Sequence, residues 1–172
     1  MWGLTFVSIK LALVSVPPFA LSGWRFFMAA VPLVLFVGRP QVPWCWLVLY
    51  ALFIAVGQFA VMFISLNMGM PAGLMSLVVQ TQVFFTIGLA VALYGESVQR
   101  TQIAGALVAS VGLVIIGITK LQGGVGAAFL LVLLAAFFWG AGNTVAKHVA
   151  RIAQGGRVSA MNFVAWSSLA AV

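Results

Sequence analysis

Three side chains spaced four residues apart could together bind a small polar molecule. Trp139, Asn143 and Lys147 fall on one face of a helix. A tryptophan next to a glycine offers a flat wall, and the asparagine amide both donates and accepts hydrogen bonds. That amide suits a zwitterion, and a lysine that flanks the substrate path attracts a carboxylate. Two simpler interpretations remain open: core packing for Trp139, and a lysine that reaches from a helix end to the headgroups for Lys147.

The start of the chain carries a second copy of this pattern. Trp2 and Lys10 are also eight residues apart, and both copies begin Trp-Gly. The same offset of 137 residues aligns Ser22 with Ser159 and Phe26 with Phe163. We interpret this as an internal repeat. Phe6 stands where the second copy has Asn143, so the two copies are not chemically symmetric.

The composition excludes several classes of protein. Apolar residues make up 65% of the chain and charged residues 5%, whereas soluble domains carry about 25% charged residues. We therefore predict an all-α polytopic protein embedded in a lipid bilayer. The basic residues are scattered singly, which argues against a nucleic-acid surface. One Cys, one His and one acidic residue leave too few groups for a metal site, a cofactor site or an enzyme.

Hydrophobic runs separated by Pro, Gly and polar residues predict the helices. The first run has only 16 residues before Pro17 and the last is also short, whereas a spanning helix needs about 20. We expect a piece of a longer protein, cut inside its first helix and ending inside its seventh. The expected helices cover residues 1–16, 19–38 with a kink at Pro32, 44–67, 71–94, 102–119 and 127–149, with a last one from about Val158.

Charges in the short loops predict the orientation. One side would carry Arg39, Arg100, Arg151 and Arg157, and the other only Lys120. The positive-inside rule then places the N-terminus in the cytoplasm. Five helices separate the two copies of the motif, so the second copy is inverted. Inverted repeats are typical of secondary transporters.

Several short motifs occur in order along the chain. They are Trp2-Gly3 with Lys10, Arg25, Met70-Pro71-Ala72-Gly73, Gly95-Glu96, and Gly105 with Gly112. Together they resemble the EamA-type drug/metabolite transporters, most of all those that export amino-acid metabolites such as cysteine and O-acetylserine. The resemblance implies ten helices in two inverted five-helix repeats in the bacterial inner membrane. Residues 1–121 would be the first repeat and residues 122–172 the start of the second.

Polar side chains inside spans are costly and by default suggest function. Ser76 and Gln80 share a helix face, which we predict to line the substrate path, whereas Gln82 would bond to a neighbouring helix. Glu96 is the one acidic residue, and we expect either a surface ion pair with Arg100 or a role at a helix end. Gly105, Ala109 and Gly112 would be a packing stripe. The remaining candidates for substrate binding are Gln58, Asn67, Arg25 and Lys10.

The leading hypothesis is an exporter of small polar metabolites, such as amino acids or cysteine-pathway intermediates, that works by alternating access. Its partners would be a small-molecule substrate and the lipid bilayer, with a homodimer if the short chain is active. The alternatives are the same family with another substrate (aromatic amino acids, nucleoside-like metabolites or drugs) and an inactive or scaffolding membrane fragment.

Overall fold

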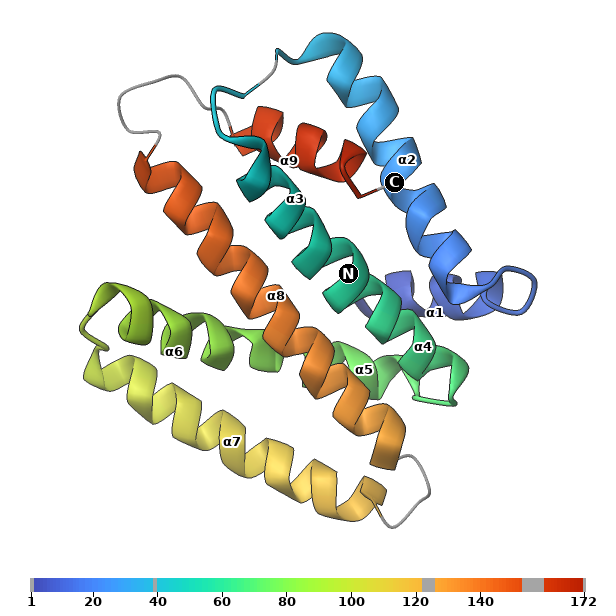
Figure 1. The fold of residues 1–172 in the computed structure, drawn as a ribbon. Coiled ribbons are helices and arrows are strands. Elements are labelled where there is room, and N and C mark those ends of the chain that lie inside the picture. The colour runs from blue at the N-terminus through green and yellow to red at the C-terminus, as the bar shows by residue number, and fades with distance from the viewer. Residues whose placement is uncertain (1, 39, 122–125, 153–159, 172) are drawn as a thin grey trace.

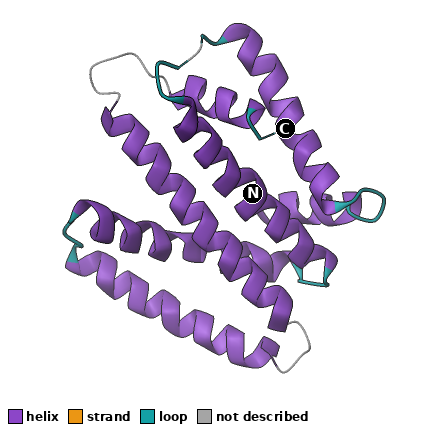
Figure 2. Ribbon diagram, in the orientation of Figure 1, coloured by secondary structure: helices purple, strands orange, loops and turns teal. Residues whose placement is uncertain are grey.

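The computed structural model describes residues 2–38, 40–121, 126–152 and 160–171, which are helical apart from short turns and include no strand (Figure 2). The elements are α1 (Trp2–Ala12), α2 (Pro18–Phe36), α3 (Trp44–Ala51), η1 (Leu52–Ala60), α4 (Val61–Asn67), α5 (Ala72–Val78), η2 (Val79–Thr81), α6 (Gln82–Tyr94), α7 (Arg100–Leu121), α8 (Gly126–Ile152) and α9 (Ala160–Leu169).

Five helical stretches in the described part of the chain are long and apolar enough to cross a bilayer. Their bounds agree within a few residues with those expected from hydropathy, so the predicted all-α polytopic membrane fold is confirmed. α1 and α9 are shorter. The five stretches are Pro18–Phe36, Trp44–Asn67, Ala72–Tyr94, Arg100–Ile118 and Gly126–Ile152.

Two of these spans are less regular than expected. The sequence predicts one continuous helix over residues 44–67 and another over 71–94. The first contains the π-helical segment η1 and the second the 3-10 turn η2. Neither segment contains a proline, and both contact α8. We attribute the irregularity to tertiary packing, which no local sequence signal announces.

α8 runs between α3–η1–α4 and α5–η2–α6 (Figure 1). Small residues let it approach both neighbours closely. A Cβ at Gly57 of η1 would overlap the ring of Phe138 on α8, and a Cβ at Gly142 would lie 2.5 Å from Cδ1 of Ile54. The buried hydroxyl of Ser65 also donates a hydrogen bond of 2.7 Å to the carbonyl of Ala128.

The packing stripe expected on α7 does not pack within the described residues. Nothing lies within 4 Å of a Cβ placed at Gly105 or Gly112. α7 instead packs against the core nearer its C-terminal end, through Leu113 and Ile116. The prediction was wrong for this chain because spacing identifies a small-residue face but not its partner.

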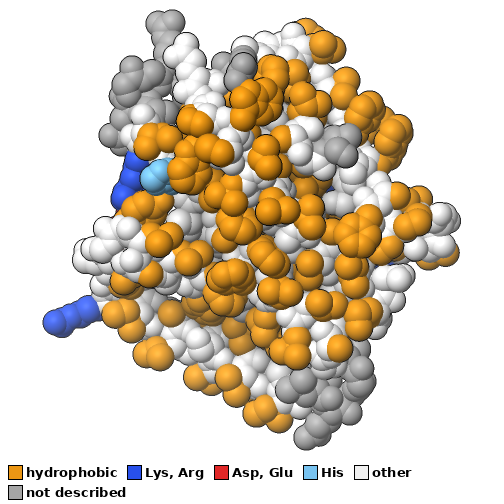
Figure 3. All heavy atoms as spheres, viewed as in Figure 1, with side chains coloured by type: hydrophobic (Ala, Val, Ile, Leu, Met, Phe, Trp, Pro, Cys, Tyr) orange, Lys and Arg blue, Asp and Glu red, His pale blue; other side chains and the backbone are white. Residues whose placement is uncertain are grey.

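Large apolar side chains cover most of the molecular face drawn in Figure 3, with the visible Lys and Arg at one edge. Leu35, Phe36, Val108 and Leu11 are each at least 70% exposed. In water such a surface would be an aggregation liability, whereas lipid tails solvate it at little cost.

Candidate functional site

α6 and α8 meet at Gly140, the glycine of the second Trp-Gly pair. A Cβ at Gly140 would lie 2.7 Å from Cβ of Phe85 and 3.0 Å from the backbone nitrogen of Thr86. Only a glycine allows the two backbones this separation. The glycine of the second Trp-Gly pair therefore lets a neighbouring helix approach closely.

A polar cluster lies next to this contact, within two of the stretches that are long and apolar enough to cross a bilayer. The amide nitrogen of Asn143 donates hydrogen bonds to Oε1 of Gln82 at 2.8 Å and to Oγ1 of Thr86 at 3.3 Å. The Thr86 hydroxyl donates to the backbone carbonyl of Gln82 at 2.8 Å. Gln82 thus bonds to a neighbouring helix, as the sequence predicted. All three side chains are only partly buried, so they remain within reach of a ligand.

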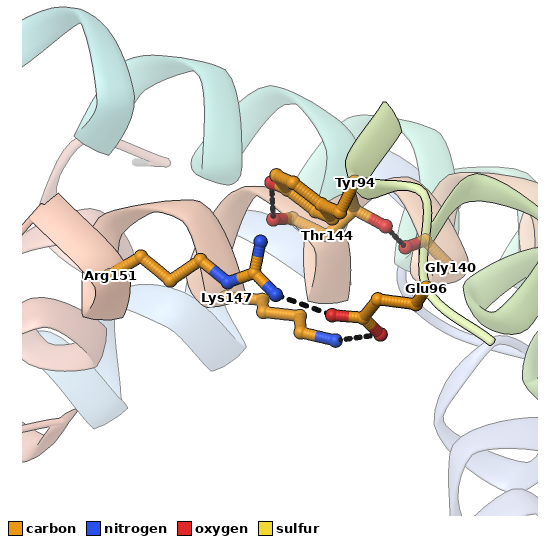
Figure 4. Close-up of polar contacts among 6 residues, drawn as sticks. All are labelled: Tyr94, Glu96, Gly140, Thr144, Lys147 and Arg151. Atoms are coloured by element: carbon orange, nitrogen blue, oxygen red, sulfur yellow. Dashed lines mark hydrogen bonds and ion pairs between the residues drawn. The ribbon is translucent and has the colours of Figure 1, made fainter. Parts of the chain in front are cut away.

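One helical turn beyond Asn143, Lys147 takes part in a charged cluster (Figure 4). Its ammonium lies 2.5 Å from Oε2 of Glu96, and the guanidinium of Arg151 contacts Oε1 of the same carboxylate. The expected partner of Glu96 was Arg100, and that prediction was wrong. Gly95 ends α6 with φ +63°, a left-handed turn that glycine adopts at little cost, and the next residue then meets α8.

The two cations change the acidity of Glu96. The hydrogen bond from Lys147 holds the pKa of the Glu96 carboxyl below its ordinary value, and the positive charges of Lys147 and Arg151 act in the same direction. The carboxylate is therefore ionised at neutral pH. Both cations lie in the last turns of α8, where they also oppose the negative end of the helix dipole.

Tyr94 joins the charged cluster to the helix contact. Its hydroxyl donates a hydrogen bond of 3.3 Å to the carbonyl of Thr144, and the Arg151 guanidinium lies 4.3 Å from the centre of its ring. On the other flank of α8, His148 lies against Trp46 with ring centres 4.5 Å apart. α8 therefore has a polar flank at Asn143 and Lys147 and an aromatic flank at His148.

Two predicted site residues lie away from the polar cluster. Gln80 is exposed on η2, and the Ser76 hydroxyl donates to the carbonyl of Gly73, three residues earlier in its own helix. The structure brings together Asn143 with Gln82, not Asn143 with Gln80. Thr86 was missed, although its position four residues after Gln82 places both on one helix face.

Gln58 is 1% exposed in η1, and its Oε1 accepts no hydrogen bond from any residue that the structure describes. Buried polar atoms without a partner are rare in native proteins. Thr81, in η2, has the same property at its hydroxyl and was not predicted. Each of the two irregular segments therefore carries one such group.

The other candidates are spread over the bundle. Lys10 and Asn67 border an open groove of about 530 Å³ between α1 and the end of α4. Arg25 is exposed on α2, with its guanidinium 4.2 Å from the centre of the Phe59 ring. Trp139 is partly buried against the core. Trp2 begins α1, but its side chain lies outside the described residues.

A sequence profile described as the EamA-like transporter family matches residues 1–118 of the chain. The chain belongs to the EamA-like transporter family. It is 42% identical over 170 residues to a protein of Salmonella typhimurium and 43% identical to one of Escherichia coli. Each is named "Probable amino-acid metabolite efflux pump". The matches cover 98% of this chain but 56% of each relative, and no solved structure matches.

The family match and the five apolar spans together describe a multi-pass membrane protein of the EamA-like family. The chain spans about half the length of the two relatives, so it is short compared with them. The Trp-Gly glycine, Asn143 and Lys147 of the second motif copy all contact α6 or the turn after it. Because these residues all meet α6 or the turn after it, we take the polar flank of the α6–α8 contact as the candidate site.

Proposed function

We propose that this protein exports small polar metabolites, such as amino acids or cysteine-pathway intermediates, across the bacterial inner membrane, with its N-terminus in the cytoplasm. The observation that carries the proposal is the hydrogen-bonded cluster of Asn143, Gln82 and Thr86 within two membrane-spanning stretches. Polar groups at that depth are costly, and they mark transport pathways by default. The names of the two relatives are consistent with this substrate class.

The mechanism would be alternating access, in which one repeat moves against the other around a fixed site. The second motif copy supplies an amide and a cation from α8, and α6 supplies the amide of Gln82 and the hydroxyl of Thr86. An amide can donate to a substrate carboxylate or accept from a substrate ammonium. The cluster can therefore exchange its own hydrogen bonds for bonds to a polar substrate.

Uptake of labelled amino acids into proteoliposomes that contain the purified chain would test this proposal, with the oligomeric state measured in the same detergent. Asn143→Ala and Gln82→Ala should lower uptake while leaving insertion unchanged, since each removes an amide that faces the partner helix. Gln80→Ala tests the other side of the same span. Impaired uptake in Gln80→Ala with normal uptake in Gln82→Ala would place the site on the opposite side from our proposal.

The alternative is that the chain is an inactive or scaffolding membrane fragment. This alternative is supported by its length, since the match covers 56% of each of the two relatives. The same assay separates the two functions. A folded, correctly inserted chain that transports no amino acid at any protein-to-lipid ratio would support the scaffold.

A further inference from the structure

The charged cluster of Glu96, Lys147 and Arg151 is not electrically balanced. Two cations meet one carboxylate, so the cluster carries a net charge of +1. Its side chains are between 33% and 42% exposed, and ion pairs with this much solvent contact are weak. A ligand that offers opposite charges at a suitable spacing can therefore replace the Glu96–Lys147 contact at little cost.

A small pocket opens beside this ion pair. Its volume is about 220 Å³, and the polar side chains around it include Thr86, Glu96, Gln102 and Lys147. Sites for drug-sized ligands measure about 300–1,000 Å³, so this pocket suits a smaller metabolite. Thr86 also belongs to the Asn143 cluster, so the pocket is continuous with the candidate transport site.

The walls of the pocket hold the two charges in place from different elements. Glu96 follows the left-handed Gly95 at the end of α6, and Lys147 projects from α8 (Figure 4). Gln102 accepts a hydrogen bond of 3.0 Å from the backbone nitrogen of Gln99, which fixes the start of α7. A negative and a positive group therefore border one small cavity, which is the arrangement that complements an α-amino acid.

We propose that this pocket binds the head group of a zwitterionic α-amino acid, with its ammonium on Glu96 and its carboxylate on Lys147. The inference rests on the proposed export function and adds the charged residues that would select a zwitterionic substrate. Binding separates Lys147 from Glu96, and each then pairs with the ligand. The two relatives' names do not assign any of these residues.

The test compares three probes that differ in charge: L-serine, N-acetyl-L-serine without the ammonium, and ethanolamine without the carboxylate. Thermal unfolding of the purified full chain in detergent reports binding, because a ligand specific for the folded state raises the midpoint with concentration. L-serine should act at concentrations about tenfold or more below the other two, since each charged hydrogen bond contributes about that factor.

The variants should then separate the two charges. Glu96→Gln should weaken L-serine binding but not N-acetyl-L-serine binding, and Lys147→Gln should weaken L-serine binding but not ethanolamine binding. Lys147→Arg keeps the positive charge and should retain most L-serine binding. This variant distinguishes the loss of the charge from a folding defect caused by any substitution at this position. Arg100→Gln removes an exposed cation at the first residue of α7, outside the lining of the pocket, and should bind like the unsubstituted chain.

Equal effects of the three probes would overturn the proposal, and so would the same loss for every probe in Glu96→Gln and Lys147→Gln. No shift with any probe would overturn it as well. Uptake by proteoliposomes is measured in parallel. If the chain takes up amino acids but its binding does not depend on the charges of the probes in this way, only the proposed pocket is refuted. If binding shows this dependence on charge but the chain takes up no amino acid, the export function is refuted.

Discussion

Gly140→Ala adds one methyl group at the closest approach of α8 to α6. The new Cβ would lie 2.7 Å from Cβ of Phe85, 3.0 Å from the backbone nitrogen of Thr86 and 3.1 Å from the backbone carbon of Phe85. Two of these atoms belong to the backbone, so a change of rotamer does not relieve the contact and α6 has to move. Overpacking of this kind costs about 1–3 kcal/mol.

The matched control is Gly105→Ala on α7, where nothing lies within 4 Å of the added Cβ. Both variants gain the same helix propensity, about 1 kcal/mol, so that contribution cancels in the comparison. Gly140→Ala should therefore have a free energy of unfolding about 1–3 kcal/mol below that of Gly105→Ala. Reversible unfolding in mixed detergent micelles, followed by circular dichroism, measures the difference.

A second measurement links this contact to the site. Asn143 lies one turn from Gly140, and its hydrogen bond to Gln82 needs the present separation of the helices. Gly140→Ala should therefore also weaken L-serine binding, whereas Gly105→Ala should not. Equal free energies of unfolding for the two variants would refute the close contact, and with it the geometry of the polar flank.

Three further changes test other parts of the structure. Ser65→Ala removes the buried hydrogen bond to Ala128 and should lower the free energy of unfolding by about 0.5–1.5 kcal/mol, whereas Ser110→Ala on the exposed side of α7 should change it less. Gly95→Ala places a residue with a side chain at φ +63°, which should lower the free energy of unfolding by about 1 kcal/mol. It should also move Glu96 away from Lys147, and cross-linking between these two positions measures that separation. Because the pKa of Glu96 is lowered in the folded state, the ionised carboxylate stabilises the fold at pH values above the ordinary Glu pKa, and this stabilisation is lost as the pH falls through the folded pKa. The difference in thermal unfolding midpoint between the unsubstituted chain and Glu96→Gln should therefore shrink with acidification. A difference that stays constant with pH would argue against the ion pair.

Hydropathy predicted the spans because lipid requires about 20 apolar residues for each one. The motif repeat also directed attention to Asn143 and Lys147. The partners of these residues were harder to predict. The cations that pair with Glu96 lie 51 and 55 residues later in the chain. The spacing of four residues, which pairs side chains along a helix, indicated Arg100 instead. The missing information was the direction of the chain after Gly95, which depends on how α6 and α8 pack.

The irregular segments were unpredictable for a related reason. Neither η1 nor η2 contains a proline, and the mostly apolar composition of η1 suits an ordinary membrane helix. Their backbone form depends on contact with α8, including the ring of Phe138 against Gly57. Gln58 was selected because a glutamine in a span is costly, but its lack of a partner among the described residues is a property of the packed bundle.

The α6–α8 contact combines two kinds of interaction with different consequences for movement. At Gly140 the backbones touch, so even a methyl group cannot be added without displacing a helix. Beyond Asn143 the helices are joined by partly exposed side chains around Glu96, which can exchange partners without any backbone shift. We therefore expect a substrate to enter at the charged end while the glycine contact stays closed. The polar cluster of Asn143, Gln82 and Thr86 lies between the two, where it would meet a substrate that has displaced the ion pair.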